Sequence, residues 1–344
     1  MQSVRCTPAK WPLLKALLVL LFLASSGLAQ SVNFSSSTNI FKPASTPAKS
    51  ILSVSLFVLV ITGVIFLVVG GLLTYAVVKF RRRKGDDSRE PAQVYGSNQV
   101  ETAWTVIPVL IVVVLFMATA RVIANVQNAV PANALHVTVI GHQFWWEYRY
   151  PGLKVVAANE LHVPAGTPTA LQLLSADTDH SFWVPTLAGK TDLIPNHPNV
   201  MWIDPPAPGL YLGQCAQYCG TQHAKMLLRV YVQPRAEFEQ WIQQQSQVAL
   251  SSDAASEGQR IFAATACVNC HAVAGTPAQG RFGPDLTHLM SRDTIGAGII
   301  ANTHENLRSW IQDPSKFKPG SLMPAMGLNE HDLNAVTAYM ETLR

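Results

Sequence analysis

Four side chains that bind soft metal ions lie within twelve residues of the chain. They are two thiols, an imidazole and a thioether, supplied by Cys215, Cys219, His223 and Met226. Such ligands suit copper, whereas hard ions such as magnesium prefer oxygen ligands. The cluster therefore indicates a copper site.

Intervals of four residues are also compatible with a zinc site on one face of a helix. Gly213 and Gly220 disfavour a helix in this stretch, because glycine is a poor helix former. A strand-like run, Leu227–Val232, follows directly. We therefore favour a loop between two strands, with His180 supplied by a neighbouring loop.

Two bridging thiolates can hold two copper ions in one compact unit, and each ion then needs an imidazole. His180 and His223 fit this role, and Met226 fits as a weak ligand on one side. The main-chain carbonyl of Gln217 could supply the other weak ligand. Sharing one electron over two ions in a stiff loop keeps geometry changes small, which suits electron transfer. No ligand position is left open for a substrate, so we expect no catalytic residue here.

A second cluster has the C-x-x-C-H spacing at which c-type haem is attached. The thiols of Cys267 and Cys270 would bond the haem vinyl groups, and His271 would be the proximal iron ligand. A thioredoxin-like redox pair would need a βαβ context that the sequence lacks. A thioether raises the reduction potential, so methionine is the expected sixth ligand. The candidates are Met323 and Met326.

Composition and charge indicate a membrane protein. Of the 344 residues, 49% are hydrophobic and only 13% are charged. Residues 1–29 and residues 79–90 each supply +3 of the net charge of +4, so the remainder carries −2. This mildly acidic remainder gives no indication of nucleic-acid binding. Four of the five cysteines belong to the two clusters, which favours metal and haem chemistry over disulfides.

The first part of the chain is expected to enter and cross a membrane. Residues 1–29 have the basic start, apolar run and small residues of a signal peptide. Residues 30–127 then hold an N-terminal lead and a hairpin with spans at about 51–78 and 102–121, since roughly 20 apolar residues suffice to cross. The basic residues between the spans mark the cytoplasmic side, so the rest of the chain is expected outside.

The rest of the chain divides into three parts. Residues 128–233 contain short alternating stretches separated by Pro and Gly turns, which predicts a β-sandwich or barrel. Residues 234–252 are expected to form a linker helix. Residues 253–344 are expected to form an all-α domain that ends in an amphipathic helix over 332–343.

The copper cluster, together with the runs 208–214 and 180–185, resembles subunit II of haem-copper cytochrome c oxidases. Residues 100–108, which open the second span, match that family as well. The resemblance implies a cupredoxin-like β-sandwich on the outer face that holds a binuclear CuA centre. The CuA ligands it implies are His180, Cys215, Gln217 through its carbonyl, Cys219, His223 and Met226.

Two positions depart from that family's pattern. The family usually has Glu at the position of Gln217, and its side chain reaches a magnesium at the interface with subunit I. An amide brings no charge, which argues against magnesium here. The family usually has Trp, linked to electron uptake from soluble cytochrome c, at the position of Phe144, so Trp145 is our candidate for receiving electrons. Glu101 matches a position near the mouth of a proton-uptake channel of subunit I; the alternative is an interfacial carboxylate in water.

Residues 253–344 resemble a class I cytochrome c through Gly258 in the first helix and through residues 283–286 after the haem motif. In that family the axial methionine lies in Pro-Gly-x-x-Met, which selects Met323 over Met326. A subunit II with a fused C-terminal cytochrome c resembles the caa3-type arrangement.

This resemblance implies an electron-input subunit in a bacterial cell membrane, with the CuA and haem domains on the outer, periplasmic or extracellular, face. Electrons would pass from an external cytochrome c donor to haem c, to CuA and then to subunit I, which reduces oxygen; subunit III is a further expected partner. Two other interpretations stay open, a CuA-containing subunit of a nitric oxide reductase and a membrane-anchored electron carrier.

Overall fold

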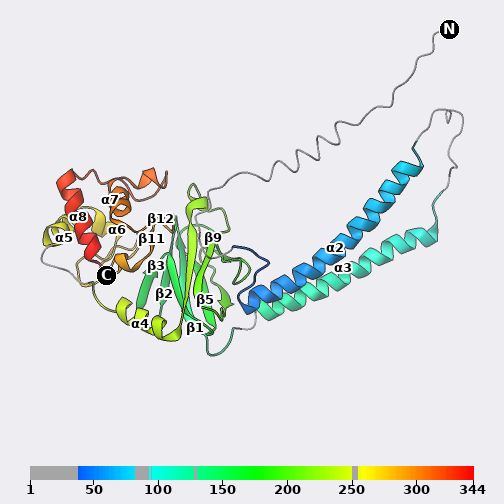
Figure 1. The fold of residues 1–344 in the computed structure, drawn as a ribbon, viewed down its shortest axis with the longest axis horizontal. Coiled ribbons are helices and arrows are strands. Elements are labelled where there is room, and N and C mark those ends of the chain that lie inside the picture. The colour runs from blue at the N-terminus through cyan, green and yellow to red at the C-terminus, as the bar shows by residue number, and fades with distance from the viewer. Residues whose placement is uncertain (1–37, 82–92, 94, 128–129, 250–254) are drawn as a thin grey trace, which may run out of the picture. The chain divides into compact units, whose positions relative to one another are not determined.

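The computed structural model describes residues 38–81, 93, 95–127, 130–249 and 255–344 (Figure 1). The expected signal peptide lies outside the described residues. So do most of the basic loop between the expected spans and residues 250–254 of the expected linker.

Among the described residues, two helices are long and apolar enough to cross a membrane, α2 (Thr46–Lys79) and α3 (Asn98–Gln127). They contact each other as a hairpin (Figure 1). At 1.5 Å per residue they are about 51 and 45 Å long, more than the roughly 30 Å of a bilayer's hydrocarbon core. Both helices extend beyond the predicted spans. With the outer domain described next, they fit a membrane protein.

A carboxylate of the outer domain fixes the start of α2. Asp204 accepts hydrogen bonds from the Ser45 hydroxyl (2.7 Å), the Thr46 amide (2.7 Å) and the Thr46 hydroxyl (2.6 Å). The first amides of a helix have no partner within the helix, and its N-terminus favours negative charge. Asp204 therefore stabilises this helix end and joins it to the outer domain.

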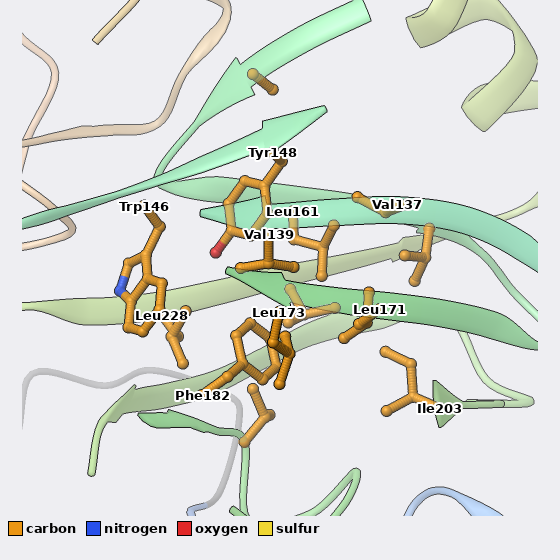
Figure 2. Close-up of a cluster of buried hydrophobic side chains, with 14 of the residues drawn as sticks. Val137, Val139, Trp146, Tyr148, Leu161, Leu171, Leu173, Phe182, Ile203 and Leu228 are labelled. Carbon is orange, nitrogen blue, oxygen red and sulfur yellow. The ribbon is translucent and has the colours of Figure 1, made fainter. Parts of the chain in front are cut away.

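Residues 135–233 form the predicted β-sandwich, whose two five-stranded sheets have the orders β3-β2-β1-β5-β8 and β4-β10-β9-β6-β7. The strands are β1 (Leu135–His142), β2 (Trp145–Tyr150), β3 (Val155–Ala158), β4 (Glu160–Pro164), β5 (Thr169–Ser175), β6 (His180–Trp183), β7 (Thr191–Leu193), β8 (Asn199–Ile203), β9 (Gly209–Cys215) and β10 (Leu227–Gln233). Figure 2 shows apolar side chains from both sheets filling the space between them. Among them, Val139, Leu161 and Phe182 are almost fully buried, because alternate residues of a strand face the same side.

Helix α4 (Arg235–Gln245) follows the sandwich within the expected linker segment. It buries Phe238 and Trp241, and the Trp241 ring lies 5.5 Å from that of Tyr150. The helix is therefore attached to the sandwich core by its apolar side chains, and its other positions are mostly exposed.

The C-terminal domain is mainly helical. Its helices are α5 (Ser256–Ala264), α6 (Cys267–Cys270), η3 (Leu289–Ser291), α7 (His304–Gln312), η4 (Pro314–Lys316) and α8 (Glu330–Thr342), with a short ladder of β11 (Thr294–Ile295) and β12 (Ile300–Ala301). Helices α5 and α8 pack closely at Gly258, where a Cβ atom would overlap the Ala335 carbonyl. Only glycine permits this approach, which brings Phe262 and Tyr339 into the domain core.

Candidate metal and haem sites

The copper cluster lies in a loop between two strands, as predicted. Strand β9 ends at Cys215, β10 begins at Leu227, and the two strands pair antiparallel. Between them, a single 3₁₀ turn holds His223. Gly220 has a φ angle of +131°, which residues with a Cβ atom rarely adopt. The loop therefore requires a glycine where it turns.

The expected position of His180 in a neighbouring loop is wrong: it is the first residue of strand β6. Strand β6 pairs with β9, and Phe182 lies opposite Cys215 in that ladder. Gly213 allows the pairing, because a Cβ atom there would overlap the Trp183 carbonyl. Strand pairing therefore brings His180 to the cysteine loop.

The six ligand candidates converge, with Cys215 and Cys219 at the centre. The two sulfur atoms lie 3.9 Å apart. The other distances are 4.0 Å from Cys215 Sγ to His180 Nδ1, 3.8 Å from Cys219 Sγ to His223 Nδ1, 3.9 Å from Cys219 Sγ to Met226 Sδ and 3.2 Å from Cys215 Sγ to the Gln217 carbonyl. His180, Cys215, Cys219 and Met226 are each at most 3% exposed. These soft donors surround a dry space of the kind that suits copper.

The second nitrogen of His180 is also held in place. His180 Nε2 lies 2.8 Å from Asp177 Oδ1, so Nε2 carries the proton and Nδ1 faces the thiols. Burial opposes the charged imidazole, but the bonds to Asp177 and Cys215 outweigh it and raise the pKa of His180. Asp177 was not predicted as a site residue. A carboxylate three residues before a candidate ligand was the signal in the sequence.

The two thiols differ in their readiness to ionise. Hydrogen bonding with Cys219 and with His180 lowers the pKa of Cys215. The neighbouring sulfur and burial raise the pKa of Cys219, because two negative charges 3.9 Å apart repel each other. One thiolate therefore forms easily, and the second requires positive charge beside it, which bound metal ions provide.

The C-terminal domain contains a largely apolar cavity beside its C-x-x-C-H motif. Cys267 and Cys270 are free thiols and line the cavity together with His271. The cavity and the solvent space at its mouth together measure about 1270 Å³. Apolar walls with two thiols and one imidazole fit a haem attached through both cysteines.

The ring of His271 is held in one orientation. Its Nδ1 lies 2.8 Å from the Pro284 carbonyl and donates to it, which leaves Nε2 free. Burial lowers the pKa of His271, which favours the neutral form that binds metals. Gly283 packs against the ring: a Cβ atom there would lie 2.6 Å from Cε1 of His271.

The remaining predicted residues differ in what surrounds them. Both Met323 and Met326 line the haem cavity, so the geometry brings both candidates to it. Trp145 also lines the cavity, and its ring stacks on His142 with centroids 4.2 Å apart. Glu101 lies in the first turn of α3 and is exposed.

Sequence reasoning missed that the β-sandwich forms part of the haem cavity. Gln143, Phe144 and Asn159 line it alongside Trp145, although they belong to the copper domain. The aromatic stretch at 144–146 was the available signal.

Three family models match consecutive parts of the chain. The model of the cytochrome c oxidase subunit II transmembrane domain matches residues 34–122, that of its periplasmic domain matches residues 153–232, and that of cytochrome c matches residues 255–344. The chain is 34% identical to cytochrome c oxidase subunit 2 of Alkalihalophilus pseudofirmus over 83% of this chain and 85% of that protein. It is 35% identical to cytochrome c oxidase subunit 2 of Bacillus sp. strain PS3 over 77% of this chain and 80% of that protein.

A solved structure, the periplasmic domain of cytochrome oxidase subunit II from Bradyrhizobium japonicum, is also similar. It has 29% identity and a TM-score of 0.34, and the match covers 34% of this chain and 97% of that one. The family models imply copper in the sandwich and haem in the C-terminal domain. The chain belongs to the cytochrome c oxidase subunit 2 family, whose members are parts of a terminal oxidase complex, and it carries a cytochrome c domain at its C-terminal end.

Proposed function

We propose that this chain is the electron-input subunit of a caa3-type oxidase, which takes electrons from an external cytochrome c and delivers them to subunit I. The observation that carries the proposal is that one short segment touches both candidate sites. Gln143 and Phe144 line the haem cavity, and the side-chain amide of Gln143 donates to the Cys219 carbonyl at 2.6 Å. A relay needs its two redox sites close to each other, whereas independent carriers do not.

The proposed sites use the residues expected from the sequence. The CuA ligands are His180, Cys215, the Gln217 carbonyl, Cys219, His223 and Met226. The haem residues are Cys267 and Cys270 for covalent attachment, with His271 and Met323 as the axial ligands. When bound, each group supplies a centre that takes up and gives away one electron without bond rearrangement.

The chain's own residues control the setting of that chemistry. Burial of His180 and of both thiols excludes water and limits movement of the ligands. Asp177 and the Pro284 carbonyl each hold one imidazole in a fixed tautomer. Stiff, dry sites need little reorganisation on electron transfer, which is the property that a relay requires.

Trp145 is the proposed point at which the copper domain receives electrons. It is 8% exposed and lines the haem cavity, so the haem, and not a soluble donor, would be its neighbour. Glu101 stays our proposal for the mouth of the proton channel, because it is an exposed carboxylate at the end of α3. Gln217 brings no carboxylate to the subunit I interface, so the proposal includes no magnesium ion there.

The proposed organisation has a signal peptide at 1–29, a membrane hairpin within 30–127, a CuA domain at 128–233, a linker helix at 234–252 and a cytochrome c domain at 253–344. The protein would lie in the bacterial cell membrane with two spans and with both redox domains outside. Subunit III would be a further partner.

Purification of the chain with its native partners tests the function. We expect co-purification of a large haem-bearing subunit, and oxygen uptake driven by reduced cytochrome c. Turnover of nitric oxide without turnover of oxygen would instead make the chain a nitric oxide reductase subunit. Purification without any haem-bearing partner would make it a membrane-anchored electron carrier.

A further inference from the structure

Two loops that carry candidate ligands are joined by hydrogen bonds across the boundary between the copper and cytochrome domains. In the copper loop, the side-chain amide of Gln222 donates to the Pro319 carbonyl, and the Lys225 ammonium donates to the Phe317 carbonyl at 2.6 Å. These acceptors lie just before Met323 in the chain, and the donors flank His223. The contact therefore connects the surroundings of the two redox sites.

Lys318, in the same loop, is a buried cation of this boundary. It is only 4% exposed, and its ammonium donates to the Phe144 carbonyl of the copper domain at 2.8 Å and to the Gly296 carbonyl at 3.3 Å. Removing an ammonium group from water is costly unless its hydrogen bonds are replaced. The Phe144 carbonyl can replace them only when the two domains are in contact.

A buried carboxylate reaches across the same boundary in the opposite direction. Glu160 of strand β4 is 2% exposed and accepts hydrogen bonds from the Thr294 amide (2.9 Å), the Thr294 hydroxyl (2.8 Å) and the Asp293 amide (3.2 Å). Asp293 in turn accepts from the Tyr231 hydroxyl at 2.6 Å. The donors to Glu160 all belong to the cytochrome domain.

Apolar and main-chain contacts also cross the boundary. Ala297 of the cytochrome domain packs with Trp145 and Ala158 in one buried cluster, and its carbonyl accepts from the Leu227 amide at 3.2 Å. The haem cavity opens onto Gln143 here. The centre of the boundary therefore contains buried apolar side chains, as specific protein interfaces do.

We propose that the cytochrome domain is a docked module, held on the copper domain in one register by Lys318 and Glu160, and not a freely moving tethered donor. A shifted register would cost the Lys318 ammonium its bond to the Phe144 carbonyl and would cost the Glu160 carboxylate its bonds to Thr294 and Asp293, which selects against other arrangements. Lys318 and Glu160 are positioning residues in this proposal. It deepens the proposed relay, because the docked register is the one that places Gln143 and Phe144 between the two redox sites.

Hydrogen exchange of the full-length chain, loaded with copper and haem in detergent, tests the docking directly. The amides of Leu227 and Thr294 bond across the boundary, so they report its opening. We expect Lys318→Ala to lower the protection of both amides about tenfold or more, because the Phe144 and Gly296 carbonyls lose a charged donor and the boundary opens more often. Lys316→Ala is the matched control, because Lys316 is an exposed lysine two residues away.

Glu160→Gln provides a second, independent test, because it keeps an acceptor but removes the charge. We expect it to lower protection at Thr294, while Glu237→Gln, at an exposed position of α4, leaves protection unchanged. Haem and copper absorption must stay intact in each variant, which separates undocking from unfolding. Unchanged protection at both amides in both variants, with both domains folded, would overturn the docked module.

Electron transfer inside the chain gives a readout that distinguishes this proposal from the proposed function. If docking positions the sites, Lys318→Ala slows reduction of copper by haem about tenfold or more at unchanged reduction potentials, in proportion to the lost protection. Loss of protection without any change in that rate would overturn the positioning role and leave the relay intact. Absence of internal electron transfer in the unaltered chain, with normal protection, would overturn the relay and leave the docking intact.

Discussion

Replacing Asp177 with Ala should weaken copper binding, although Asp177 itself is not a proposed ligand. Its carboxylate accepts from His180 Nε2 at 2.8 Å and so directs Nδ1 toward Cys215. Loss of such a partner typically lowers metal affinity by 10 to 100-fold, or about 1.4 to 2.7 kcal/mol. The Asp177 side chain is 32% exposed, so solvent weakens its hydrogen bond and we expect an effect near tenfold.

The assay is a competition titration of the full-length chain with a copper chelator, followed through the copper–thiolate absorption. Asp179→Ala is the control, because this exposed aspartate lies two residues further along the chain. Asp177 also accepts from the main-chain amide of Gln143 at 2.6 Å, and Asp177→Asn keeps an acceptor for that contact. Equal copper affinity in Asp177→Ala and Asp179→Ala would refute the orienting role.

Three further predictions follow from close packing and burial. Gly283→Ala places a Cβ atom 2.6 Å from His271 Cε1, so we expect the optical spectrum to lose the signature of proximal haem ligation. Gly152→Ala is the control, because a Cβ atom there meets nothing within 4 Å. An unchanged spectrum in Gly283→Ala would contradict this prediction. Gly258→Ala should force α5 away from α8 and lower the stability of the cytochrome domain by roughly 2 to 4 kcal/mol. Thermal unfolding measures this loss, and an unchanged Tm would contradict the prediction. Burial lowers the pKa of His162 from 6.5 to about 4, so unfolding binds a proton and stability falls as the pH drops below 6.5. Between pH 7.5 and pH 5 the free energy of unfolding, measured by denaturant titration, should fall by about 2 kcal/mol. His162→Phe should abolish this fall, and the control His197→Phe should keep it. Equal dependence of stability on pH in the two variants would contradict the prediction.

The sequence predicts those features that are encoded in local spacing. Strands such as β1 and β10 alternate apolar and polar residues, and the resulting β-sandwich is confirmed. Gly220 also disfavours a helical zinc site in the sequence, and its φ of +131° agrees with the predicted loop. Chain segments of this kind carry their own signal, because a few neighbouring residues decide the structure.

Other features depend on partners that are distant in the sequence. Strand β6 has only four residues, too few for a recognisable alternation, so His180 was wrongly expected in a loop. Lys318 gives no local sign that it bonds to Phe144, 174 residues away. Asp177, near His180, could have been found, because oriented imidazoles commonly have a carboxylate partner.

In the proposed relay, electrons pass within one chain from the cytochrome domain to the copper domain. Stopped-flow reduction of the full-length, copper- and haem-loaded chain by a limiting one-electron donor tests it most directly. We predict that haem absorption changes first and that copper absorption follows at a rate independent of protein concentration. If copper stays oxidised, or is reduced only at a rate proportional to protein concentration, electrons do not pass from haem to copper within one chain.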